Sequence, residues 1–171
     1  MFKNLSYFWL SLAIIVLQIF LIDALSIAMW LRPMIFPLVV ILLQMEWRQI
    51  WVLLTSTLVG VTMDLALGGA GLYTATLVPL TVLRRWVMYI TTKRSIEQGA
   101  QSSLLSRLSS RQIMVYTAIM LTIHHTMFFT METLSFAHPL QLLATIVCST
   151  LLSVLLAWPL IGIFTRKIVA Q

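Results

Sequence analysis

Three residues at four-residue spacing, Gly60, Asp64 and Gly68, lie in or at the end of the apolar run 50–67. If this run crosses a membrane, Asp64 should face protein or a water-filled cavity, because a charge exposed to hydrocarbon is costly. Four residues advance a helix by only about 40° beyond a full turn, so the three share a face about 80° wide. Small side chains on that face allow helix backbones to approach closely within a bilayer. The pattern therefore predicts a functional or assembly contact around Asp64.

Two further carboxylates are expected at the level of Asp64. With a rise of about 1.5 Å per residue, Asp64 lies roughly 24 Å beyond Arg48, in a hydrocarbon core about 30 Å thick. Asp23 reaches a similar height in the first apolar stretch, and Glu132 falls near the outer boundary of a later one. These positions predict an outer polar patch. The alternatives are that Asp23 and Glu132 simply reach the interface, and that Asp64 and its glycines pack against a neighbouring helix of the same chain.

The composition indicates an all-α integral membrane protein. Hydrophobic residues make up 60% of the 171, only 9% are charged, and the mean hydropathy is +0.99. This length suits one polytopic domain spanning 1–171. In so apolar a chain, the net charge of +6 is better explained by membrane topology than by nucleic-acid binding. The single cysteine, Cys148, excludes a disulfide scaffold.

Apolar windows of membrane-crossing length predict a six-transmembrane-helix bundle. The expected spans are 7–25, 33–45, 50–67, 72–90, 113–133 and 140–164. The second span is short and begins with Pro33 and Pro37, which fix the backbone and remove donors, so we expect an irregular or partly re-entrant start. It is retained because it places ten of the 11 lysines and arginines on the side of the termini, leaving Arg32 alone opposite. This asymmetry predicts cytoplasmic termini.

The loop 91–110 is the only long polar stretch and is expected on the cytoplasmic side. It is either a connector whose basic residues meet anionic lipid head groups or a docking segment for a cytoplasmic partner. We favour the connector, because basic residues beside cytoplasmic helix ends are the rule in membrane proteins.

The histidines could suggest a metal site, but their spacing argues against one. His124 and His125 are followed by Glu132 and His138, but adjacent residues point about 100° apart on a helix. The spacing matches no standard set of metal ligands, so we expect each histidine to find a hydrogen-bond partner within the bundle. No nucleophile elbow, phosphate-binding loop or haem motif is present in the sequence. We therefore expect a protein that is not an enzyme and holds no cofactor or metal.

The stretch 60–73, GVTMDLALGGAGLY, resembles the signature of the rod shape-determining protein MreD family. In that family a glycine, an aspartate four positions later and further glycines close the third span and open the next. The six-span layout, the chain length, the cytoplasmic termini and the basic loop after the fourth span are also similar. The motif covers about a dozen residues, whereas the layout covers nearly the whole chain. The short second span and the pair Arg84 and Arg85 are not part of the resemblance.

The resemblance implies a component of the bacterial cell-elongation machinery in the cytoplasmic (inner) membrane. Such proteins bind MreC and, through it, the glycosyltransferase RodA, a peptidoglycan transpeptidase and the filament protein MreB. It also implies a fold like that of the substrate-binding subunits of energy-coupling-factor vitamin transporters. We hypothesise that one contact holds the transmembrane helix or membrane-proximal segment of MreC. Its residues are Gly60, Asp64, Gly68 and Gly71, with the nearby carboxylates Asp23 and Glu132.

The rival hypothesis is a small transporter subunit that binds a vitamin in an outward-facing pocket between spans. The outer carboxylates and the histidines could line such a pocket, since transporter sites lie among helices around polar groups. Against it, the first span has no Ala-x-x-x-Ala pattern, with which such subunits dock their energising partner. A third hypothesis, an enzyme acting on a lipid-linked substrate, has only the outer carboxylates in its favour.

Overall fold

The computed structural model is all-helical, as predicted, with no strand among the residues it describes, which are 2–25, 31–43, 47–92, 108–134 and 138–169. The helices are α1 (Phe2–Leu25), α2 (Leu38–Ile41), α3 (Gln49–Leu67), α4 (Leu72–Thr92), α5 (Ser110–Thr133) and α6 (Pro139–Val169). Five of the six predicted spans therefore coincide with long helices. Residues 93–107, which include most of the predicted cytoplasmic loop, lie outside the described residues.

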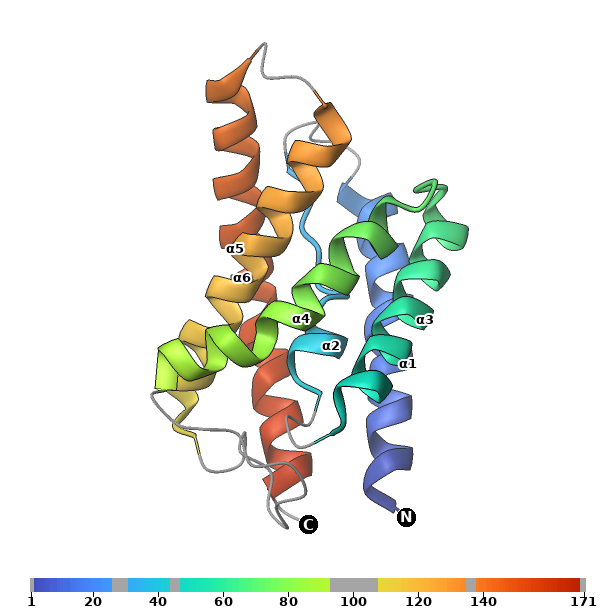
Figure 1. Ribbon diagram of the computed structural model, residues 1–171, viewed down its shortest axis with the longest axis vertical. Coiled ribbons are helices and arrows are strands. Elements are labelled where there is room, and N and C mark those ends of the chain that lie inside the picture. Colours follow the sequence, from blue (N-terminus) through green and yellow to red (C-terminus); the bar gives the residue numbers. More distant parts are fainter. Residues whose placement is uncertain (1, 26–30, 44–46, 93–107, 135–137, 170–171) are drawn as a thin grey trace.

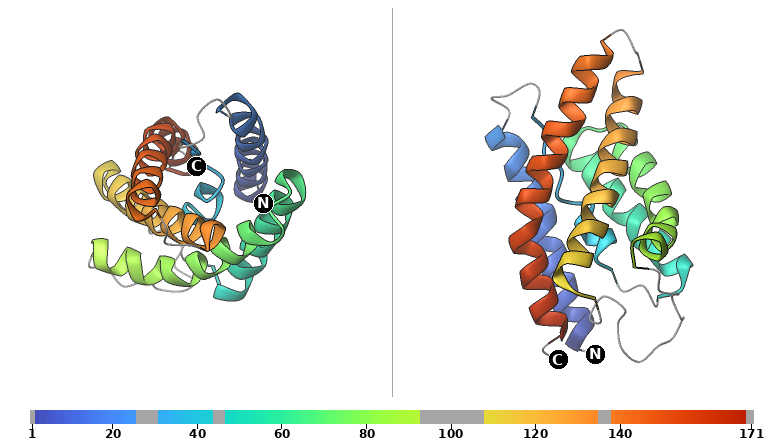
Figure 2. Two further views of the ribbon diagram at one scale, coloured as in Figure 1. Left: turned by 90° about the horizontal axis from the view of Figure 1, so that it is seen from above. Right: turned by 90° about the vertical axis from the view of Figure 1, so that its left-hand side faces the viewer.

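The five long helices surround the segment 31–43, which runs through the middle of the bundle (Figure 2). Successive passes along the bundle alternate in direction (Figure 1). The start of α1 and the finish of α6 lie at one end, here called the inner end. The turn between α3 and α4 and the last residues of α5 lie at the opposite end, called the outer end (Figure 1). Among these helices, α4 runs obliquely across its neighbours.

Three helical segments in the described part of the chain are long and apolar enough to cross a membrane: Gln49–Leu67, Ser110–Thr133 and Pro139–Ile163. In α1 the described apolar stretch is shorter, Phe8–Phe20, and α4 carries Arg84 and Arg85. Large apolar side chains cover the outside of the bundle, as expected for contact with lipid. By length and composition these helices indicate a membrane protein, and its six membrane spans remain a prediction.

The predicted second span, 33–45, has the irregular start expected from its prolines, but the continuous helix needed for a six-helix bundle is absent from its described residues. Residues 31–35 have no regular structure, and only the four residues of α2 are helical, whereas 44–46 lie outside the described residues. The physical reason is the proline pair: Pro33 and Pro37 restrict the backbone and cannot donate hydrogen bonds. Every residue from 33 to 43 is nevertheless buried. The irregular segment is therefore an interior element, enclosed by the helices that would otherwise pack on one another.

Side chains from the surrounding helices satisfy the backbone of this central segment, defined as residues 31–43. Gln18 of α1 donates to the carbonyl of Pro33 (3.0 Å) and accepts from the amides of Ile35 and Phe36. From α6, Ser149 accepts from the amide of Arg32 (3.1 Å) and Ser153 from that of Met34 (2.9 Å). Nearer the inner end, Tyr116 donates to Ile41 O (3.4 Å) and Arg84 to Leu43 O. Non-helical backbone at membrane depth requires such partners.

Candidate functional site

The carboxylate of Asp64 accepts three hydrogen bonds from the first turn of α4. Its Oδ1 accepts from the amide of Tyr73 (3.0 Å), and its Oδ2 from the amide (3.0 Å) and hydroxyl (2.6 Å) of Thr74. The first amides of a helix have no partner within the helix and carry partial positive charge, so a carboxylate there is stabilising. Asp64, near the end of α3, is thus a cap for the next helix.

Each glycine of the motif lies where a side chain would be sterically unfavourable. Gly68 ends α3 in the left-handed conformation (φ 69°), and Gly71 also has a positive φ of 92°, which side chains disfavour. A Cβ on Gly69 would lie 2.6 Å from the Asp64 carboxylate, and one on Gly60 would lie 2.7 Å from the Cα of Thr74. The small face of α3 therefore makes the close helix contact predicted from its sequence, and makes it with α4 of the same chain.

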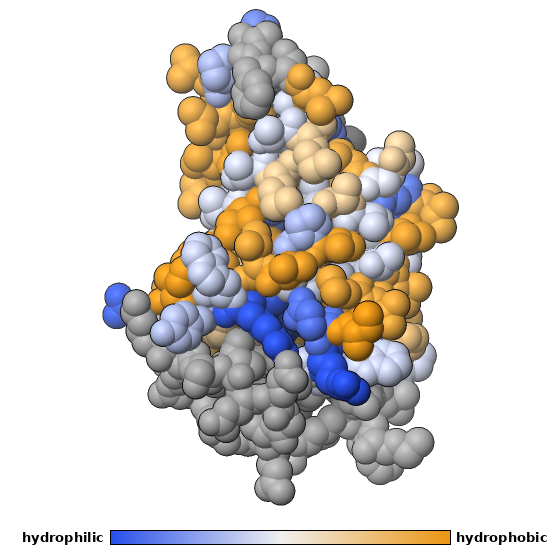
Figure 3. Space-filling model, viewed as in Figure 1, coloured by the Kyte–Doolittle hydropathy of each residue, from blue (hydrophilic) through white to orange (hydrophobic). Residues whose placement is uncertain are grey.

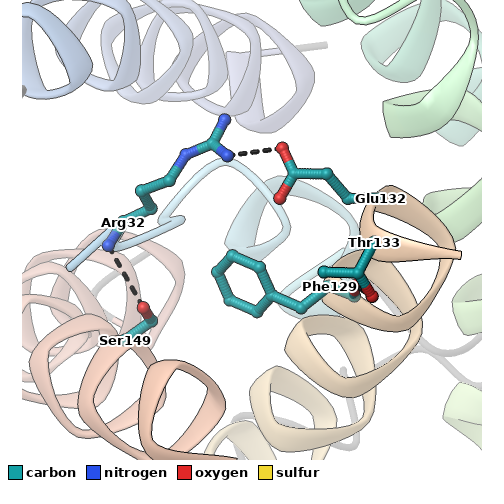
Figure 4. Close-up of polar contacts among 5 residues, drawn as sticks. All are labelled: Arg32, Phe129, Glu132, Thr133 and Ser149. Carbon is teal, nitrogen blue, oxygen red and sulfur yellow. Dashed lines mark hydrogen bonds and ion pairs between the residues drawn. The ribbon is translucent and has the colours of Figure 1, made fainter. Parts of the chain in front are cut away.

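The second predicted carboxylate, Glu132, pairs with Arg32 at the outer end (Figure 4). The Arg32 guanidinium lies 5.9 Å from the centre of the Phe128 ring. The Arg32 amide donates to Ser149, so Arg32 joins the last turn of α5 to α6 (Figure 4). The two charged side chains are 40% and 32% exposed, so the ion pair itself contributes only about 1 kcal/mol or less.

Tyr73 connects the Asp64 cap to this ion pair. Its backbone amide binds Asp64, while its ring packs on Phe128, over which the Arg32 guanidinium lies. The Tyr73 ring is 5.0 Å from that of Phe128. Asp64 and Glu132, predicted to lie at one level, are thus joined at the outer end through Tyr73 and Arg32. The side chain of Asp23 lies outside the described residues.

Sequence analysis did not identify Arg32, Tyr73 and Ser149 as parts of the site. One signal for Arg32 was present: it is the sole basic residue predicted on the outer side, where two carboxylates were expected. No comparable signal marked Tyr73. The motif includes this residue, but apolar helices commonly carry a tyrosine at their ends. The contact of Ser149 depends on the path of the central segment, which the sequence does not reveal.

The adjacent histidines have different environments. His125 Nδ1 donates to the carbonyl of Leu121 (2.7 Å), and its Nε2 lies 3.2 Å from Ser153 Oγ. His124 is completely buried, with an edge-to-face contact to Phe36 at 5.3 Å, and neither ring nitrogen has a hydrogen-bond partner among the described residues. The prediction that each histidine finds a partner is therefore confirmed for His125 and wrong for His124.

The arrangement at the outer end fixes helices and leaves a small exposed surface. Gly68 and Gly71 are exposed at the tip of the α3–α4 hairpin, and Leu65, beside them, is 81% exposed. Within the described residues, no group of three or more His, Cys, Asp or Glu could hold a metal ion. No protein-family profile, curated protein or solved structure matches the chain. Its function is therefore inferred from its own residues.

Proposed function

We propose that the protein is a non-enzymatic membrane component of the bacterial cell-elongation complex that binds MreC. The observation that carries the proposal is the motif of residues 60–73, in which the glycines and Asp64 form one closely packed helical hairpin. Through MreC the protein acts with RodA, the peptidoglycan transpeptidase and MreB in lateral wall synthesis. This role places it in the cytoplasmic membrane with both termini in the cytoplasm, in an architecture resembling vitamin-transporter binding subunits.

The internal contacts of the motif divide its residues into two groups. Gly60 and Asp64 face α4, so they support the hairpin from inside. Gly68 and Gly71 at the tip, with Glu132 at the same end, are exposed and available to a partner. The outward face of α3 continues this surface, with Leu58, Val61 and Leu65 exposed by 70%, 42% and 81%. We assign the MreC helix to this face and the membrane-proximal segment of MreC to the tip.

Co-purification of MreC with a bulky variant of α3 tests the assignment. Leu65→Trp places a large ring on the proposed contact face, and Leu155→Trp is its matched control, since Leu155 on α6 is 68% exposed. We expect Leu65→Trp to lower the MreC recovered per mole of protein, because tight helix packing in lipid depends on close approach. Leu155→Trp should leave recovery unchanged. Equal recovery with both variants would contradict the contact face, and no recovery of MreC with the wild type would contradict the function.

The rival function, a substrate-binding subunit of a vitamin transporter, is favoured by one observation. The central segment interrupts a pass along the bundle, and substrate sites in transporters are typically built around such discontinuous helices. The buried, unpartnered nitrogens of His124 lie against Phe36 of that segment. Mass spectrometry of small molecules released from gently purified protein distinguishes the two functions. A stoichiometric ligand would favour transport, whereas MreC without a ligand would favour the scaffold.

A further inference from the structure

His124 of α5 is a buried polar side chain that the fold leaves unpaired. It is 0% exposed, and neither ring nitrogen has a hydrogen-bond partner among the described residues. The next residue, His125, shows that the same helix can satisfy an imidazole, since its two nitrogens contact Leu121 O and Ser153 Oγ. Native proteins rarely retain a buried polar group without a partner, so His124 points to a role beyond packing.

Together with three aromatic side chains, His124 forms a closed cycle of ring contacts, here called the aromatic cluster. The centre of the His124 ring lies 5.3 Å from that of Phe36 in the central segment, which lies 5.5 Å from that of Tyr73 in α4. Phe128 of α5 completes the cycle, at 5.0 Å from Tyr73 and 6.2 Å from His124. The rings meet edge-to-face or tilted, arrangements in which aromatic groups attract one another. A planar aromatic ligand would be attracted by the same rings.

Arg32 lies over the outer side of the aromatic cluster. Its guanidinium carbon is 5.9 Å from the centre of the Phe128 ring, and its side chain is 40% exposed. The hydrogen bond to Glu132 uses one of the five N–H donors of the guanidinium. Phe128 therefore has the guanidinium of Arg32 near it on one side and the unpaired imidazole of His124 on another. A single ring in its place would lie within reach of both polar groups.

The outer end is the side from which a polar molecule can approach the aromatic cluster. Apolar side chains line both edges of the bundle in Figure 3, where a carboxylate would have to cross hydrocarbon. At the outer end, by contrast, Arg32 and Glu132 are partly exposed and their ion pair is of the weak, solvated kind. Protein interiors are close-packed, so a ligand must displace a side chain, and Phe128 is the ring beneath Arg32.

We propose that the aromatic cluster is a binding site for a small aromatic carboxylate that enters from the outer end. Its carboxylate binds Arg32, because a guanidinium can donate two parallel hydrogen bonds to a carboxylate. Its ring takes the place of Phe128, which turns aside, and a polar substituent on the far side of the ring bonds to His124. A neutral imidazole offers one donor and one acceptor, so a hydroxyl suits either tautomer. The site is independent of MreC binding, which is assigned to the outside of α3.

The melting temperature of the detergent-purified protein, measured over a concentration series of three probes, tests the site. A ligand that binds only the folded protein raises this temperature in proportion to its affinity. The probes are 4-hydroxybenzoate, benzoate, which lacks the hydroxyl, and phenol, which lacks the carboxylate. We expect 4-hydroxybenzoate to bind about fivefold more tightly than benzoate, from one neutral hydrogen bond, and about tenfold more tightly than phenol, from a charged one.

His124→Phe is the decisive variant, because it keeps an aromatic ring and removes only the unpaired nitrogens. It should bind 4-hydroxybenzoate and benzoate equally, and without a probe it should melt no lower than the wild type, since no hydrogen bond is lost. Arg32→Gln should bind 4-hydroxybenzoate and phenol equally. The matched control is His138→Phe, which removes an exposed imidazole and should leave all three affinities unchanged.

Three results would overturn the site. The first is no rise in the melting temperature of the wild type with 4-hydroxybenzoate. The second is a preference for 4-hydroxybenzoate over benzoate that persists in His124→Phe, because the hydroxyl would then bind elsewhere. The third is a His124→Phe variant that melts lower and binds all three probes more weakly, which would make His124 a packing residue.

Discussion

At the scale of the residue, Asp64 is a charge in an apolar helix whose cost is offset by the start of the following helix. Its three hydrogen bonds all come from Tyr73 and Thr74. Because those donors are backbone amides and a hydroxyl in the first turn of α4, Asp64 fixes the angle between two helices as well as their ends. The residue therefore helps to set the shape of the hairpin tip through contacts within its own chain.

Replacing Asp64 by alanine should lower stability by about 1–3 kcal/mol, because two buried or half-buried amides lose their acceptor. Thr74→Val removes only the hydroxyl donor and should cost about 1 kcal/mol or less. The measurement is the temperature at which half of the detergent-purified protein loses its monodisperse elution peak. Asp64→Ala melting at the wild-type temperature would show that the cap is dispensable.

The sequence predicted where the polar residues lie better than it predicted what they contact. The position of Asp64 near the outer end follows from helical rise, since distance along a helix is fixed by geometry. Helical rise does not reveal which hydrogen bonds Asp64 accepts. The donors lie beyond a turn whose path depends on Gly68 and Gly71. For His124, the general rule that buried polar groups are paired predicted a hydrogen bond. The aromatic rings of Phe36 and Phe128 occupy its surroundings instead.

At the scale of the element, the α3–α4 contact depends on the absence of a side chain at Gly60. A Cβ there would meet the backbone of Thr74 at 2.7 Å, so α4 must shift. Gly60→Ala should therefore cost about 1–3 kcal/mol. Gly162→Ala in α6 is the matched control, because nothing lies within 4 Å of its added Cβ. Alanine favours a helix over glycine, so that variant should melt at or above the wild-type temperature. Equal melting of the two variants would contradict the close contact.

One side chain of α1, Gln18, makes three hydrogen bonds to the backbone of the central segment. Replacing it by methionine leaves the carbonyl of Pro33 and the amides of Ile35 and Phe36 without this partner. Each unsatisfied buried group costs about 1–3 kcal/mol, so we expect a loss of at least about 2 kcal/mol. Gln141→Met, at an exposed position of α6, makes the same chemical change and should leave the melting temperature unchanged. If Gln18→Met melts with the wild type, the Gln18 hydrogen bonds do not stabilise the segment.

The bounds of a helix could be predicted where the length of its apolar run sets them. They could not be predicted where contacts with distant parts of the chain set them. The predicted span 113–133 and α5 differ by three residues at the start, where Ser109 and Gln112 form a capping box that adds a turn. The segment 33–45 has the composition of a buried helix. The backbone of residues 32–36 instead binds Gln18, Ser149 and Ser153, whose distance from these residues in sequence concealed the arrangement.

At the scale of the whole molecule, the distribution of charge and the fold are mutually consistent. The described acidic side chains, Asp64 and Glu132, lie at the outer end, whereas Arg48, Arg85 and Arg111 lie toward the inner end. An excess of lysine and arginine marks the cytoplasmic side of membrane proteins. The inner end, where α1 begins and α6 finishes (Figure 1), is therefore the end we expect in the cytoplasm.

Cysteine labelling in spheroplasts tests this orientation, and the chain suits the experiment because Cys148 is its single cysteine. In a Cys148→Ser background, Ala70→Cys marks the exposed tip of the outer end and Ser110→Cys the exposed start of α5 at the inner end. A membrane-impermeant maleimide should label Ala70→Cys in spheroplasts and Ser110→Cys only after permeabilisation. Labelling of both in intact spheroplasts would contradict a full crossing between these positions, and the reverse order would place the termini outside. Either result would remove the topological basis of the proposed function, because MreB is cytoplasmic.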